Sequence, residues 1–270
     1  VTIHDLIPME MPDHSAQSTL FKTIVRRAAK RARHILTPSA YSAQQITQRY
    51  GITSDKISVL PWAANEDMQF IDDPMLLQPC MDRYLLGERN LILMFAAEDP
   101  RKNTHRMLRA WAALPEMLRR HWRLLLVGLN SRARDTVDTL LNELHLDSSS
   151  VRTLDYVPRE EIPVLMSLAD ILCFPSLSEG FGLPVLDAFR TRTAVITSDR
   201  SSLPEVAGDA AHLVNPTSAD SIADALHLLM TQPRTRDAYI QKGLQRDSLY
   251  RWQTTAERFV QIVKRHFPVK

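Results

Sequence analysis

The chain has 270 residues, of which 44% are hydrophobic and 24% charged, so it can bury the core of one large domain or two small ones. A formal net charge of +2 excludes a strong general attraction to nucleic acid. Two cysteines, Cys80 and Cys173, exclude a disulfide framework and suit a reducing compartment, so we expect a cytoplasmic protein. No apolar run is long enough to cross a membrane.

Residues 1–60 form a group of their own. Their pattern predicts a strand over 1–6, a helix over 20–36, a helix over 39–50 capped by Ser39, and a strand over 57–60. Because a strand pattern already begins at Val1, which is not a methionine, we expect a chain truncated at its N-terminus. The segment 65–87, rich in Pro and Asp, is interpreted as an irregular connection.

From residue 91 onward, apolar strands alternate with helical patterns. We predict strands over 91–97, 123–129, 151–157, 171–176, 194–198 and 211–214. The helices between them are expected over 104–114, 132–144, 160–169 and 221–230, and a last helix over 254–267. This alternation predicts an α/β fold with a parallel sheet, right-handed crossovers and a ligand at the carboxyl ends of the strands.

The loop from Ser176 to Pro184 falls at such a carboxyl end. Gly180 and Gly182 allow the backbone to approach a ligand closely, and Pro184 suits the first turn of a helix. The amides of that turn favour an anion, while the carboxylates of Glu179 and Asp187 match the vicinal hydroxyls of a sugar or ribose. The alternative is a structural strand–helix turn in which Asp187 only favours the helix dipole.

The string from Pro175 to Asp187 resembles the E-x₇-E signature of retaining glycosyltransferases with the GT-B fold, which bind nucleotide-diphosphate sugars. Segments 201–211, 213–216, 1–6 and 36–42 are similar to the same family, so the resemblance covers nearly the whole chain. It implies that 1–60 is the remainder of the acceptor-side domain, that 61–248 is a Rossmann-like donor-binding domain, and that 249–270 is a helix crossing back to the first domain.

The resemblance also assigns roles. Glu179 would contact the donor sugar, and Asp187, which stands where the family usually has a glutamate, the ribose. The nucleotide-sugar site would further include the loop residues Gly180, Phe181, Gly182 and Leu183. Asp187 is shorter than glutamate by one methylene, about 1.5 Å, which its rotamer must compensate.

A basic pair, Arg101 and Lys102, opens the helix that follows the strand at 91–97. Cations at a helix N-terminus are unfavourable by about 0.3–1 kcal/mol each, so a bound diphosphate would compensate them. The alternative is a solvated pair neutralised by Glu98 and Asp99. The string Pro-Arg-Lys-Asn resembles the family's diphosphate-binding segment, which implies that Lys102 holds the diphosphate with help from Arg101. Many relatives carry another arginine slightly upstream, and this chain has none at 95–97.

Two further positions follow from the resemblance. The histidine of the first strand faces the donor in the family, a role that falls on His4; the alternative is a histidine bonded to backbone at a strand end. The nucleobase is expected near Tyr156 and Val157. Asp5 could orient the imidazole or act on the acceptor.

The helix predicted over 20–36 has an apolar face and a face rich in Lys and Arg. A solvated surface helix is the favoured interpretation. Peripheral contact with the inner face of a membrane remains an alternative, because lipid-linked acceptors are common in the resembled family.

The resulting hypothesis is a retaining hexosyltransferase that moves a sugar from a nucleotide-diphosphate donor to a hydroxyl acceptor, without cofactor or metal. Among relatives the Pro-Arg-Lys-Asn string leans toward GDP-mannose. The expected acceptor is a surface polysaccharide or a lipid-linked glycan. The alternatives are a noncatalytic nucleotide-sugar-binding subunit and a nucleotide-sugar epimerase or phosphorylase on the same fold. Glu179, Lys102 and His4 are the predicted catalytic residues.

Overall fold

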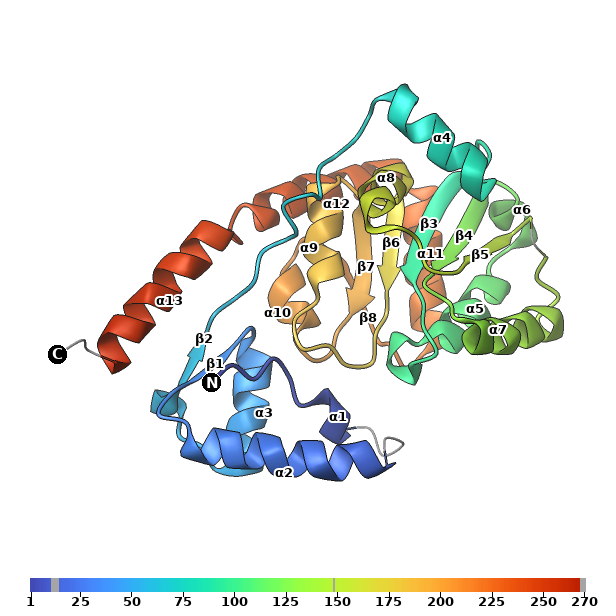
Figure 1. Cartoon of the computed structure of the whole chain (residues 1–270). Helices are drawn as coiled ribbons and strands as arrows, with labels where there is room; N and C mark the ends of the chain where they lie inside the picture. Colours follow the sequence, from blue (N-terminus) through green and yellow to red (C-terminus); the bar gives the residue numbers. More distant parts are fainter. Residues whose placement is uncertain (11–14, 148, 268–270) are drawn as a thin grey trace.

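The computed structural model describes residues 1–10, 15–147 and 149–267 (Figure 1). Its larger sheet has six parallel strands in the order β5-β4-β3-β6-β7-β8. In chain order the strands are β3 (Asn90–Phe95), β4 (Trp122–Val127), β5 (Val151–Leu154), β6 (Ile171–Phe174), β7 (Ala194–Ser198) and β8 (His212–Val214). The predicted α/β class and all six strands are confirmed. Most of the predicted strands extended two or three residues too far, because the apolar pattern continues into the loops at the carboxyl edge.

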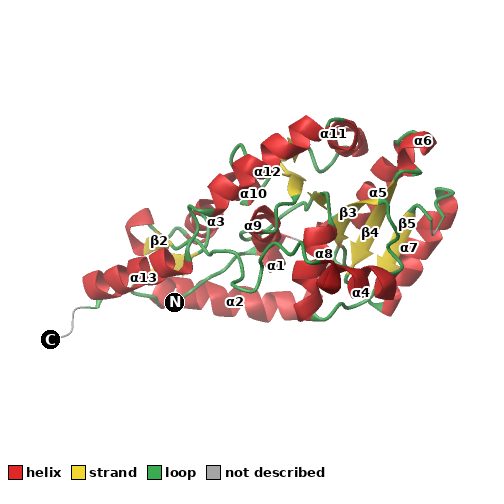
Figure 2. Ribbon diagram, turned by 90° about the horizontal axis from the view of Figure 1, so that it is seen from above, coloured by secondary structure: helices red, strands yellow, loops and turns green. Residues whose placement is uncertain are grey.

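Helices cover both faces of this sheet (Figures 1 and 2). One face packs against α5 (Thr104–Ala113), α7 (Ser131–Glu143) and α11 (Ala219–Thr231). The other packs against α8 (Ile162–Leu168), α9 (Leu183–Arg190) and α10 (Leu203–Ala207). Successive strand residues alternate between the two cores: Ile92 and Met94 face the first, Leu91 and Leu93 the second. The central strands β3 and β6 are therefore almost entirely apolar in sequence.

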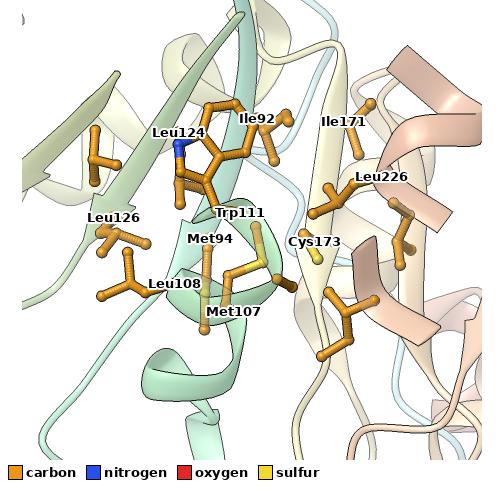
Figure 3. Packing of buried hydrophobic residues seen from close by; sticks show 14 of the residues in the cluster. Ile92, Met94, Met107, Leu108, Trp111, Leu124, Leu126, Ile171, Cys173 and Leu226 are labelled. Carbon is orange, nitrogen blue, oxygen red and sulfur yellow. The ribbon is translucent and has the colours of Figure 1, made fainter. Parts of the chain in front are cut away.

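Trp111 of α5 lies in the middle of the first core, beside Ile92 and Leu124 (Figure 3). Its ring is fully buried, and its indole nitrogen donates to the hydroxyl oxygen of Ser150 at 2.8 Å. The indole N–H is thus hydrogen-bonded, so burying the large apolar ring stabilises the core without the cost of an unpaired buried donor.

Residues 1–60 build a smaller unit around the two-stranded parallel sheet of β1 (Ile35–Thr37) and β2 (Ile57–Val59). It also contains α1 (Ile7–Glu10), α2 (Ser15–Arg31) and α3 (Ala40–Tyr50), whose cap is Ser39 as predicted. Two predictions were wrong here. The strand at 1–6 is reduced to a bridge between Thr2 and Leu36, and the helix at 20–36 ends at Arg31 because Ile35–Thr37 pair with β2.

The connection between the two units was also partly mispredicted. Segment 65–87 contains α4 (Pro74–Tyr84), whose first turn is capped by the carboxylate of Asp73. The sequence carried this signal, but the segment was interpreted as irregular because it is rich in Pro and Asp, and the helix contains Pro79 in its interior. A short helix, α6 (Glu116–Arg119), precedes β4.

Two helices end the chain, α12 (Pro233–Asp247) and α13 (Trp252–His266). The first packs on α9, where a Cβ on Gly243 would lie 2.6 Å from the ring of Phe189. The second leaves the larger sheet and reaches the smaller unit, where the rings of His266 and His34 stack at 3.8 Å (Figure 1). Within the described residues, no helix combines the length and apolarity that a membrane span needs.

Candidate active site

The loop between β6 and α9 holds Glu179 at the carboxyl edge of the sheet. Its two glycines are required by close contacts. A Cβ on Gly180 would lie 2.7 Å from the Cβ of Asp5, and one on Gly182, whose φ is 115°, would lie 2.7 Å from Leu203. Both distances are shorter than atoms tolerate, so the loop can carry only glycine at these positions without moving its neighbours.

The basic pair reaches Glu179 from the neighbouring strand β3. It lies in a short 3-10 turn, Pro100–Lys102, capped by Asp99. The Lys102 Nζ lies 2.7 Å from Glu179 Oε1, and the Arg101 Nη1 lies 3.2 Å from Glu179 Oε2. Since β3 and β6 are adjacent, their loops meet and bring the three predicted residues together. The side chains are 12–21% exposed, so the charges are partly shielded from water.

The charges of Arg101 and Lys102 are largely balanced by nearby carboxylates. Burial alone would lower the pKa of Arg101, but the carboxylates of Glu179 and Asp99 outweigh it and raise that pKa. The sequence offered Glu98 and Asp99 as carboxylates that could neutralise the basic pair. Asp99 does so, because its Oδ2 lies 2.9 Å from Arg101 Nε. Glu98 instead pairs with Arg132. Lys102 therefore pairs with the carboxylate of Glu179, and its remaining N–H groups can contact a ligand.

A small cleft of about 210 Å³ opens beside this group. One wall is the loop 179–184, and the other consists of His4, Asp5 and Trp62 from the smaller unit and the connection. The Trp62 ring lies 5.1 Å from the ring of His4 and 5.7 Å from that of Phe181. His4 and Glu179 thus line the same cleft. Asp5 Oδ1 accepts from the backbone N–H of Ile7, the first residue of α1, at 3.1 Å.

Hydrogen bonds join the two units next to the cleft. The hydroxyls of Ser39 and Ser42 donate to the Gly180 carbonyl at 2.8 and 3.3 Å. The carboxylate of Glu205 accepts from the backbone N–H groups of Ala40 and Tyr41 at 2.8 and 3.2 Å. Glu205 therefore neutralises the N-terminus of α3. Sequence reasoning included Glu205 in a family-like string but gave no signal of its partner, which lies 165 positions away.

Asp187 has a different environment from Glu179. It lies on α9, is buried, and accepts at 3.0 Å from the backbone N–H of Asn65 and at 3.2 Å from the Asn65 side-chain amide. Burial raises the pKa of Asp187 to about 6, although the bonds from Asn65 oppose the rise. It does not line the cleft beside Glu179. Its carboxylate connects the interdomain segment to α9, and its role at a ribose stays a prediction.

The remaining candidates lie on the carboxyl side of β5. Tyr156 is 83% exposed, whereas Val157 is buried in the second core. Two strands, β4 and β3, separate β5 from β6, so at about 4.8 Å per strand these residues start roughly 14 Å from the Glu179 strand. That spacing leaves room for a nucleotide between them, and their assignment to the base remains a prediction.

Residues 82–246 match the family described as Glycosyl transferases group 1, and residues 1–67 match Glycosyltransferase Family 4. Among curated relatives, O-antigen chain mannosyltransferase B of Escherichia coli is 27% identical over 97% of this chain and 69% of its own length. O-antigen chain mannosyltransferase RfbU of Salmonella typhimurium is 28% identical over 84% of this chain and 59% of its own length.

Solved structures show the same architecture. Anabaena Alr3699/HepE in complex with UDP-glucose aligns with a TM-score of 0.83 at 17% identity, covering 97% of this chain and 71% of that one. WaaG, a glycosyltransferase involved in lipopolysaccharide biosynthesis, aligns with a TM-score of 0.79 at 20% identity, covering 92% of this chain and 68% of that one. These likenesses establish the GT-B fold. With the family match over more than half of its length, the chain belongs to the Glycosyl transferases group 1 family.

Proposed function

We propose that this protein is a retaining hexosyltransferase that moves mannose from GDP-mannose to a hydroxyl of a glycan or lipid-linked acceptor. The observation that carries the proposal is the joining of Lys102, Arg101 and Glu179 across the loops of β3 and β6, with His4 lining the cleft beside Glu179. The names of the mannosyltransferase relatives favour mannose. Alr3699/HepE, solved with UDP-glucose, makes that donor the first competitor to test.

The chemistry follows from the charges. As the bond between the anomeric carbon and the donor phosphate oxygen breaks, negative charge grows on the diphosphate. Lys102 and Arg101 stabilise that charge, and Glu179 accepts hydrogen bonds from the sugar hydroxyls. The acceptor hydroxyl oxygen bonds to the same face of the anomeric carbon, and its proton passes to the departing phosphate oxygen. The anomeric configuration is retained because the acceptor oxygen attacks the face from which the phosphate departs. No protein nucleophile is required.

The test measures GDP-mannose and UDP-glucose turnover by the purified protein, with and without EDTA. Lys102→Ala and Glu179→Gln should each lower turnover by about 100- to 1000-fold, the usual loss when one transition-state partner is removed. Lys242→Ala is the matched control for the loss of a lysine. Lys242 lies on the surface of α12, where its ammonium pairs with exposed Asp209. Equal turnover in all variants would refute the proposed site, and loss of turnover in EDTA would refute metal independence.

A noncatalytic nucleotide-sugar-binding subunit is the second candidate. It is favoured by the engagement of Asp187 with Asn65 and by the lack of an arginine at 95–97. Such a subunit would bind GDP-mannose, as a rise in melting temperature, without consuming it. An epimerase would instead convert the donor sugar in the absence of any acceptor, which product analysis separates from transfer and hydrolysis.

A further inference from the structure

Two consecutive serines, Ser201 and Ser202, hold the backbone of Glu179. They belong to the loop 199–202, which connects β7 to α10. The Ser201 hydroxyl oxygen accepts from the Glu179 N–H at 3.0 Å. The Ser202 hydroxyl lies 2.8 Å from the carbonyl oxygens of both Glu179 and Phe181, so its single proton can be donated to either one. Both polar groups of the Glu179 main chain are therefore bound by side chains of a neighbouring loop.

The backbone of Ser201 has a conformation that is unfavourable for a residue with a Cβ. Its φ is 57°, in the left-handed region that glycine adopts readily. A serine persists in this region when the surrounding contacts stabilise it, and its hydrogen bond with the Glu179 N–H is such a contact. Glycine at this position would keep the turn and lose the hydrogen bond. What the serine adds over glycine is thus an acceptor for Glu179.

The loop that carries the two serines is itself held in place. The Asp199 N–H donates to the Val214 carbonyl at 2.9 Å. The Arg200 N–H donates to the Ser198 hydroxyl oxygen at 3.1 Å. Ser202 is fully buried. Because these contacts restrict the loop, its side chains can fix the position of another group.

The carboxylate of Glu179 is held by a different set of contacts. Its oxygens lie 2.7 Å from Lys102 Nζ and 3.2 Å from Arg101 Nη1. In the proposed function the same two cations bind the donor diphosphate, so they share their N–H groups between the glutamate and the phosphates. The hydrogen bonds from the serines involve neither cation. They therefore hold Glu179 in place whether or not a donor is bound.

We propose that Ser201 is a positioning residue for Glu179: it fixes the main chain of the glutamate so that the carboxylate points at the hydroxyls of the donor sugar. This inference rests on the proposed function, in which Glu179 accepts hydrogen bonds from that sugar. Without the Ser201 hydroxyl the carboxylate is free to shift. A shift of about 1 Å is enough to impair a contact of this kind severely.

The test compares the affinities of GDP-mannose and GDP, measured by calorimetry. Ser201→Gly suits the left-handed turn and removes the acceptor of the Glu179 N–H. It should weaken GDP-mannose binding about tenfold, the cost of about one hydrogen bond, and leave GDP binding unchanged. Only GDP-mannose carries the sugar that Glu179 would contact, whereas a merely structural role would affect both ligands or neither. Equal changes for the two ligands would overturn the proposal.

Two controls ask whether Ser201 acts through Glu179. Ser198→Ala removes a hydroxyl that accepts from the Arg200 N–H at the start of the same loop, and it should leave the ratio of the two affinities unchanged. An equal change of this ratio in both variants would indicate general loosening of the loop and overturn the proposal. In a Glu179→Ala background, Ser201→Gly should have no further effect on GDP-mannose binding. A further tenfold loss there would also overturn it.

A second measurement does not need a donor. Hydrogen exchange of the Glu179 amide, followed by NMR, should be about tenfold faster in Ser201→Gly than in the unsubstituted protein, while the amides of α9 keep their rates. An unchanged rate at Glu179 would overturn the inference. If the unsubstituted protein binds no nucleotide sugar but the exchange at Glu179 changes as expected, the proposed function fails and the fixing of Glu179 by Ser201 stands.

Discussion

The buried carboxylate of Asp187 should make folding stability depend on pH. Its ordinary pKa is 3.8 and its pKa in the folded protein is about 6, so the folded state holds a proton that the unfolded state has released between these values. The free energy of unfolding must therefore fall as pH rises through this window. At about 1.4 kcal/mol per pH unit, the complete effect is about 3 kcal/mol, of which about 2 kcal/mol falls between pH 4.5 and 7.5.

The perturbation is Asp187→Asn, which keeps the size and removes the titration. Urea unfolding of both proteins at several pH values gives the stability difference, and taking the difference cancels every other titrating group. The stability of the unsubstituted protein relative to the variant should fall by about 2 kcal/mol from pH 4.5 to 7.5. The same change at Asp224, an exposed residue of α11, controls for net charge. A difference that stays constant, within about 0.5 kcal/mol, would refute the assignment of a buried, protonatable carboxyl.

Three other changes test the contacts around the site. Gly180→Ala should lower GDP-mannose turnover about 100-fold, because the added Cβ would lie 2.7 Å from the Cβ of Asp5. A second substitution, Asp5→Gly, should restore part of the turnover, and no recovery would contradict this contact. Glu205→Gln should cost about 1 kcal/mol of stability in urea unfolding by weakening the capping of α3, and an unchanged midpoint would contradict the capping. Trp111→Phe should lower the free energy of unfolding by about 2 kcal/mol in the same assay, because the buried Ser150 hydroxyl loses the indole N–H as its donor. A loss under about 0.5 kcal/mol would contradict a stabilising role of this hydrogen bond.

Several elements could be predicted from local sequence alone. The six strands of the larger sheet were found because mostly apolar runs bounded by polar segments identify strands, and the four central strands, β4, β3, β6 and β7, are largely buried on both faces. The cap of α3 at Ser39 was found because capping is a contact between residues three apart. The resemblance to the family implied that Lys102 and Glu179 share one site, and the structure brings them together because β3 and β6 are neighbours whose carboxyl ends share one edge.

Other elements depended on partners far away in the chain. Ile35–Thr37 looked like the end of a helix, and it is a strand because β2 is available to pair with it. The contact of Asp187 with Asn65 could not be predicted because Asn65 is 122 positions away, and the role of Asp187 at a ribose stays a prediction.

The sequence by itself determined the α/β class, the order of the strands along the chain and the loops that carry Glu179 and Lys102. Periodicity and turn chemistry act over a few residues, so they can be detected without a structure. Only the tertiary structure decided which carboxylate faces the cleft and which one holds the interdomain connection. Those outcomes depend on burial and on contacts between distant segments, and neither leaves a periodic trace in the chain.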